Sequence, residues 1–105
     1  MFIAQNRFKM NAGFGEHFER APQRSQVGEV PGFLFTARPK GDDEGVYINL
    51  SVWESRETYD AWRESDAFQQ AHAGGGPAQG VMAEPPQLLL AQVLFSEGSL
   101  IPATA

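Results

Sequence analysis

The sequence contains no cysteine, which excludes disulfide bonds and thiolate metal sites in this chain of 105 residues. It has only two lysines, no basic run and a formal charge of −5, so we do not expect a nucleic-acid-binding surface, which needs clustered Lys and Arg. The longest apolar run, around Leu88 to Leu90, is far too short to span a bilayer. The N-terminus lacks a basic segment followed by a long apolar stretch. We therefore expect a cytoplasmic protein with no membrane segment.

The composition is that of a chain able to build a hydrophobic core. Hydrophobic residues make up 42% of the sequence, and eight of them are Phe. The length fits a single domain over residues 1–105, with a tail from about residue 96 that we expect to be poorly ordered. Because so small a domain leaves much apolar surface exposed, we also expect a homodimer that buries one face of a sheet.

The hydrophobic periodicity predicts four strands and two helical regions. Pro22 should end the first helix, Ser55 and Asp66 are the expected N-caps of two segments of the second helical region, and that region should break near Ser65. In the strand at 30–38 we expect the alternation to place Phe33, Phe35 and Ala37 on one face. The expected elements are strands at 2–8, 30–38, 46–53 and 88–95, helices at 13–21, 55–65 and 67–72, and a loop at 73–87. The order β-α-β-β-α-β predicts an α+β, ferredoxin-like fold.

Asn6 stands out in the first strand. Read with a period of two, Phe2, Ala4, Asn6 and Phe8 share one face, and only the asparagine is polar. A buried amide without hydrogen-bond partners costs a few kcal/mol. Asn6 is therefore either satisfied by neighbouring backbone or it faces a functional cavity.

His72 and Trp62 are the other candidate site residues. With no cysteine, a cofactor held by histidine must use His17 or His72, and we interpret His17 as solvent-facing. His72 has Phe68 one turn before it; a single histidine there is often only a packed or surface residue. Trp62 is spaced as a core residue. In one unbroken helix Trp62 and His72 would lie about 15 Å apart along the axis, whereas a bend at 65–66 could turn both toward one cavity.

These residues together resemble the IsdG-type haem-degrading monooxygenases of the antibiotic biosynthesis monooxygenase superfamily. The shared stretches are AQNRF around Asn6, PGF at 31–33, SVWES at 51–55 and AWRESDAFQQAH at 61–72. The resemblance covers nearly the whole chain and implies a dimeric α+β barrel. Asn6, Trp62 and His72 match the family's functional trio in type, order and approximate spacing.

The resemblance implies a role for each site residue. His72 would be the proximal ligand of haem iron, Trp62 would press the porphyrin out of plane, and Asn6 would donate a hydrogen bond on the distal side. Phe68 would line the haem site, and Arg24 is our choice for holding the propionates. Haem would be both substrate and cofactor, with dioxygen and an external electron donor, a separate reductase. Two alternatives remain: a cofactor-free monooxygenase acting on quinols or polycyclic aromatics, and a non-catalytic haem-binding protein.

Overall fold

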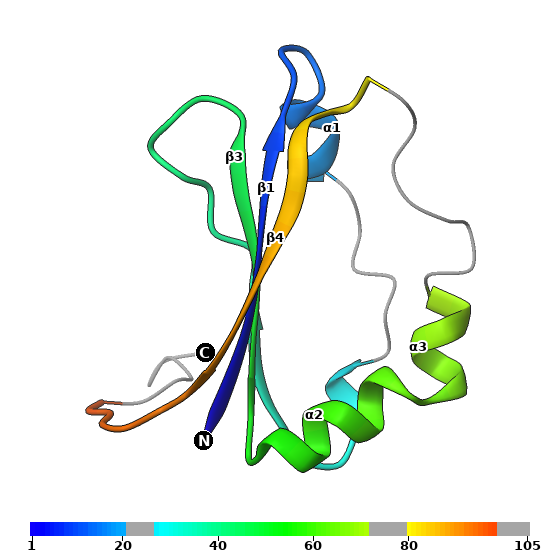
Figure 1. Ribbon diagram of the computed structural model, residues 1–105, viewed down its shortest axis with the longest axis vertical. Coiled ribbons are helices and arrows are strands. Elements are labelled where there is room, and N and C mark those ends of the chain that lie inside the picture. Colours follow the sequence, from blue (N-terminus) through cyan, green and yellow to red (C-terminus); the bar gives the residue numbers. More distant parts are fainter. Residues whose placement is uncertain (21–26, 72–79, 99–105) are drawn as a thin grey trace.

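The protein forms one antiparallel sheet in the order β2-β3-β1-β4 (Figure 1). We analysed a computed structural model that describes residues 1–20, 27–71 and 80–98; for His17 and Ala71 it describes the backbone alone. The strands are β1 (Phe2–Met10), β2 (Phe33–Ala37), β3 (Val46–Trp53) and β4 (Met82–Gln92).

The helices lie on one side of this sheet (Figure 1). They are α1 (Gly15–Arg20), the 3-10 helix η1 (Val27–Glu29), α2 (Arg56–Arg63) and α3 (Asp66–Ala71). The arrangement confirms the predicted α+β, ferredoxin-like fold, and the predicted break between α2 and α3 is present. α1 ends at Arg20; Pro22 lies outside the described residues.

The pairing of β1 with β3 fixes which residues face the helices. Phe2 is opposite Trp53, Asn6 is opposite Asn49 and Phe8 is opposite Tyr47. Phe2 contacts Tyr59 of α2, so the even-numbered residues of β1 point toward the helices. The odd-numbered residues of β1 point to the other face.

The main core lies between α2 and the lower half of the sheet in Figure 1. α2 begins after Ser55, whose side chain accepts a hydrogen bond from the Thr58 backbone, and Thr58 completes a capping box. The helix buries Tyr59 and Trp62 against Trp53. Burial of each aromatic side chain contributes roughly 1.5–3 kcal/mol. The remaining core residues are Phe2, Ala4 and Val27.

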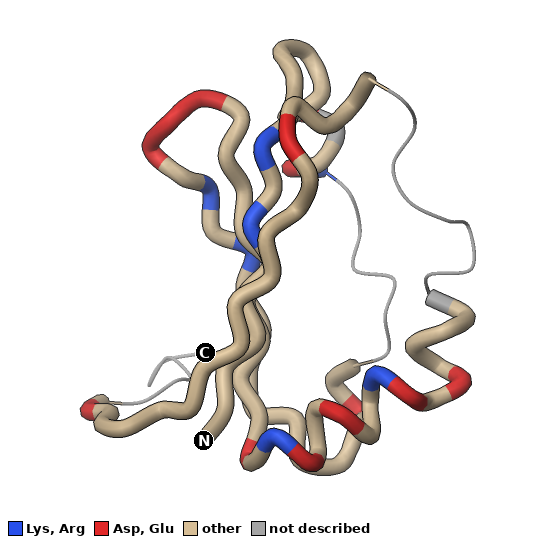
Figure 2. Tube along the Cα trace, viewed as in Figure 1, with Lys and Arg blue, Asp and Glu red and all other residues tan. Residues whose placement is uncertain are grey.

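The helices α2 and α3 carry acidic residues together with Arg56 and Arg63. Figure 2 shows acidic residues along α2 and α3 and in the turn between β2 and β3, whereas basic residues lie on β1 and on the segment after β2, in the upper half of the picture. No helix within the described residues is long and apolar enough to cross a membrane.

The predicted start of the last strand was wrong. β4 begins at Met82, six residues before Leu88, and includes Pro85 and Pro86, which we had assigned to a loop. Proline cannot donate a hydrogen bond to a neighbouring strand, but β4 lies at the edge of the sheet, where one side needs no partner. The register shifts between the partners of Arg7 and Lys9, at the position of the two prolines.

The predicted face of β2 was also wrong in part. Phe33 pairs with Trp53 and packs against its ring at 5.5 Å, but Phe35 pairs with Val52. The register shift between Phe33 and Phe35 interrupts the alternation. Phe35 therefore shares the face of Val52, away from the helices.

Candidate functional site

Asn6 lies in the middle of the helix-facing side of the sheet. It is flanked by Asn49 of β3 and Leu88 of β4. Its Oδ1 atom is buried and has no hydrogen-bond partner, the one buried side-chain polar atom of this kind among the described residues. Because such an unpartnered group costs about 1–3 kcal/mol, this position favours the binding of a further hydrogen-bonding group, such as a water or a ligand. A half turn about the Cβ–Cγ bond exchanges Oδ1 and Nδ2, so the same position can present a donor.

Two aromatic clusters flank the Asn6 position along the strands. On one side is the α2 core described above, with Trp53 and Tyr59. On the other side, Phe18 of α1 packs between Phe8 and Tyr47, with ring centroids 5.8 and 5.1 Å away. Gly15 opens α1 here because any larger side chain would collide with the Tyr47 ring. α1 therefore lies close against the upper part of the sheet.

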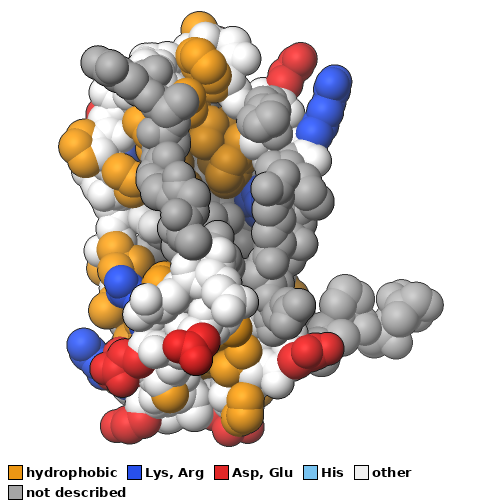
Figure 3. Space-filling model, turned by 90° about the vertical axis from the view of Figure 1, so that its right-hand side faces the viewer, with side chains coloured by type: hydrophobic (Ala, Val, Ile, Leu, Met, Phe, Trp, Pro, Cys, Tyr) orange, Lys and Arg blue, Asp and Glu red, His pale blue; other side chains and the backbone are white. Residues whose placement is uncertain are grey.

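Among the described residues, the surface between the two clusters is partly exposed. Asn49 is exposed and Leu88 is 48% exposed, although both face the helix side of the sheet. Figure 3 looks onto this side of the molecule and shows hydrophobic side chains exposed in its upper half. A buried amide oxygen next to an exposed apolar side chain suits a flat, largely apolar ligand that carries a polar centre.

Trp62 is a core residue in this structure. It is 6% exposed, stacks on Trp53 at 6.4 Å and meets the edge of Phe68 at 5.5 Å. Its ring is therefore fixed on both sides. Phe68 is half-buried and packs against the same core, so α3 is joined to the site through these two rings.

The joint between α2 and α3 is held by Ser65. Its hydroxyl donates to the Trp62 carbonyl at 2.6 Å and accepts from the Phe68 backbone at 3.2 Å. The predicted N-cap Asp66 was therefore wrong by one residue: Ser65 caps α3, and Asp66 is its first residue. Arg63 stacks over the rings of Tyr59 and Phe68, which further fixes the angle of the joint.

Of the predicted site residues, the structure brings together Trp62 and Phe68 and places Asn6 on the same side of the sheet. His72 and Arg24 lie outside the described residues, and His17 is described by its backbone alone. His72 follows directly on α3, which ends at Ala71. Within the described residues, no three His, Asp or Glu side chains gather as a metal site.

Sequence reasoning missed Asn49 and Leu88. Asn49 carries a signal similar to that of Asn6, a single amide on a strand face that also holds Tyr47 and Trp53, two and four residues away. Leu88 gave no such signal, because its place beside Asn6 depends on the register of β4.

The chain is similar to proteins of known kind. Residues 1–74 match the family model described as antibiotic biosynthesis monooxygenase. A protein of Staphylococcus saprophyticus named heme oxygenase (staphylobilin-producing) is 33% identical over 81 residues, covering 70% of this chain and 75% of the relative.

Two solved structures of the heme-degrader MhuD are similar over almost the whole chain. MhuD from Mycobacterium tuberculosis with two hemes bound in its active site is 28% identical, with a TM-score of 0.73, covering 93% of this chain and 100% of that one. A MhuD mutant with two manganese protoporphyrin IX molecules per active site is 26% identical, with a TM-score of 0.75, covering 94% and 100%. By its sequence match and its fold, the chain belongs to the antibiotic biosynthesis monooxygenase family.

Proposed function

We propose that the protein is a haem-degrading monooxygenase of the IsdG type, which binds haem and opens the porphyrin ring to release iron. The observation that carries this proposal is the buried, unpartnered amide oxygen of Asn6 beside an open, partly apolar surface. The relatives named heme oxygenase and the MhuD structures with bound heme support it.

The described residues fit a porphyrin on the helix side of the sheet. Leu88 would offer apolar contact to the porphyrin, and Asn6 would offer a polar group. Bound haem would supply the reaction with dioxygen at its iron. Asn6 would hold a hydrogen bond on the distal side, which orients the reaction toward a meso carbon and lowers the cost of its own burial.

The remaining roles are assigned by family resemblance. We propose His72 as the proximal iron ligand, Trp62 as the residue that presses the ring out of plane, Phe68 as an apolar wall and Arg24 as a propionate partner. Trp62 is held between Phe68 of α3 and Trp53 of β3, so the chain could apply a steric push without losing its own geometry.

The reaction needs dioxygen and electrons from outside the chain. The sequence has no flavin or nicotinamide motif, so we propose a separate reductase as the electron donor. The cytoplasm, which holds the reduced cofactors that such a reductase uses, is the compartment we propose. The products would be free iron and an open tetrapyrrole.

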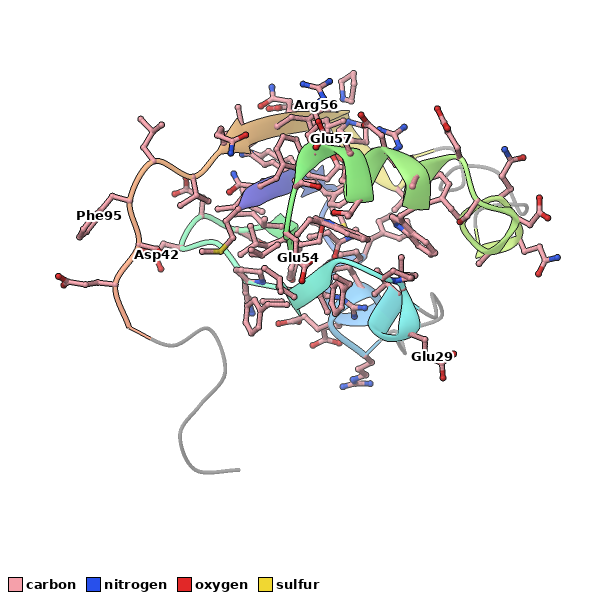
Figure 4. All side chains as sticks on the ribbon, turned by 90° about the horizontal axis from the view of Figure 1, so that it is seen from below. Glu29, Asp42, Glu54, Arg56, Glu57 and Phe95 are labelled. Carbon is pink, nitrogen blue, oxygen red and sulfur yellow. The ribbon has the colours of Figure 1, made fainter. Side chains whose placement is uncertain are left out.

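We further propose a homodimer that covers the face of the sheet opposite the helices. This face carries apolar side chains on all four strands, namely Ile3, Phe35, Ile48, Leu50, Val52, Leu89 and Ala91. Leu89 is 57% exposed, and beyond β4 Leu94 is 95% and Phe95 78% exposed. Phe95 points away from the body of the molecule (Figure 4). A second copy of the same face would bury the exposed members of this set as the inner wall of an α+β barrel.

A titration separates this proposal from its alternatives. Haemin is added to the purified chain and the Soret band is followed; reductant and air are then admitted. Binding followed by loss of the Soret band supports haem degradation. Binding without loss would instead indicate a haem-binding protein, and no binding would indicate a cofactor-free monooxygenase of the same family.

A further inference from the structure

A polar groove continues from the Asn6 site toward β2. It has a volume of about 480 Å³ and lies between α1 and the sheet. Its polar lining residues are Glu19, Thr36, Arg38, Lys40, Tyr47 and Asn49. Asn49 is the residue directly opposite Asn6, so the groove and the proposed haem site share a wall.

Both cations of the groove lie on the segment that follows β2. Ala37 pairs with Leu50 and Lys40 bridges to Tyr47, which places Arg38 alongside Asn49. At a strand spacing of about 4.8 Å, the segment with Arg38 lies about 10 Å from β1. The side chain of Arg38 is long enough to span much of the distance between this segment and β1.

The two cations are held in different ways. Arg38 stacks over the Phe18 ring at 5.1 Å and donates to the Phe18 carbonyl at 3.2 Å, so its guanidinium is fixed against α1. Lys40 pairs with Glu19 at 2.8 Å, and this hydrogen bond and charge raise the pKa of Lys40. The lysine is therefore charged at neutral pH, but its counter-ion is a neighbouring carboxylate that another carboxylate could replace.

The polarity of the site changes from one edge of the sheet to the other. Across the Asn6 position the order is Arg38, Asn49, Asn6 and Leu88, from cationic to apolar. A porphyrin has the same asymmetry, with acidic propionates on one edge and apolar substituents on the other. We infer that the groove binds the propionates of the porphyrin. Arg38 and Lys40 would be their cationic partners in addition to the proposed Arg24, and Glu19 would be the carboxylate they displace. This inference rests on the proposed function and adds the orientation of the ring.

The test measures haemin affinity of the full-length ferric protein by Soret titration at low salt, without reductant. Lys40→Gln should weaken haemin binding about three- to fivefold, as expected for a half-exposed charge pair, and Arg38→Gln about tenfold. Glu19→Gln should tighten binding, because it removes the competing carboxylate. Lys9→Gln is the matched control: it removes the same charge from the chain's other lysine, which lies on the opposite face of the sheet. It should change the affinity less than twofold.

The dimethyl ester of haemin tests the same contacts from the ligand side. Its binding should be insensitive to Lys40→Gln and Glu19→Gln, since it carries no propionate charge. The inference is overturned if Lys40→Gln and Lys9→Gln weaken haemin equally, if Glu19→Gln weakens it, or if the ester responds as haemin does. In those cases the wild type still binds haemin and the proposed function stands. If the wild type binds neither porphyrin, the proposed function fails and this inference with it.

Discussion

Replacement of Asn6 by alanine separates a ligand-directed amide from a structural one. Removal of a partnered amide leaves its partner unsatisfied and costs about 0.5–1.5 kcal/mol, more if the site is buried. The Oδ1 of Asn6 has no partner and is itself a cost of about 1–3 kcal/mol. Its removal should offset the packing lost with the amide group. We therefore expect the free energy of unfolding of the haem-free protein to be unchanged or to rise by up to about 1 kcal/mol.

Asn11 provides the matched control, because its Nδ2 donates to the Gly80 carbonyl at 2.7 Å. Asn11→Ala should lower the free energy of unfolding by about 1 kcal/mol, whereas Asn6→Ala should not. Urea denaturation of both variants, with the wild type beside them, measures the difference.

The Asn6→Ala variant should still bind haemin with near-normal affinity. Under reductant and air its Soret band should decay little or not at all, because the distal hydrogen bond is missing. A loss of stability larger than that of Asn11→Ala would show that Asn6 is a structural residue. Haem degradation at the wild-type rate would refute its catalytic role.

The other predictions concern the iron ligand, the porphyrin shape, the helix joint and the dimer. His72→Ala should weaken haemin binding sharply and His17→Ala should not; the reverse order in a titration would reassign the ligand. Trp62→Phe keeps an aromatic residue in the core, whereas Trp62→Ala would lower the free energy of unfolding by about 3–5 kcal/mol. Haem bound to Trp62→Phe should be more planar by resonance Raman, and an unchanged distortion would remove Trp62 from this role. Ser65→Ala should lower the free energy of unfolding, measured by thermal denaturation, by about 1 kcal/mol because α3 loses its N-cap. An unchanged stability would contradict the capping contact. Leu50→Glu, on the face opposite the helices, should yield monomers by sedimentation equilibrium; a wild type that is already monomeric would contradict the dimer.

The elements that depend on local signals were predicted well. β3 occupies the predicted range 46–53, and α2 begins after Ser55 as its capping chemistry indicated. β4 was misread because the tolerance of Pro85 and Pro86 depends on the strand lying at the edge of the sheet, which only tertiary pairing decides. The bulge in β2 has the same origin.

The candidate site was likewise predictable only where it depends on local sequence signals. The strand alternation placed Asn6 on one face with Phe2, Ala4 and Phe8. The structure adds that this face turns toward the helices and that the Asn6 oxygen has no partner. The neighbours Asn49 and Leu88 depend on register, and the groove of Arg38 and Lys40 depends on the position of α1 against β3, so none of them follows from local pattern. The roles of His72 and Arg24 remain predictions.

The most direct test of the account is the fate of the haem iron. The haemin complex is treated with reductant in air, with catalase present to remove free peroxide, while a ferrous chelator reports released iron and the Soret band reports intact haem. We predict that iron appears in step with the loss of the Soret band, in the wild type but not in Asn6→Ala or in haemin without protein. A Soret band that persists in the wild type, or that decays equally in all three samples, would contradict haem degradation by this protein.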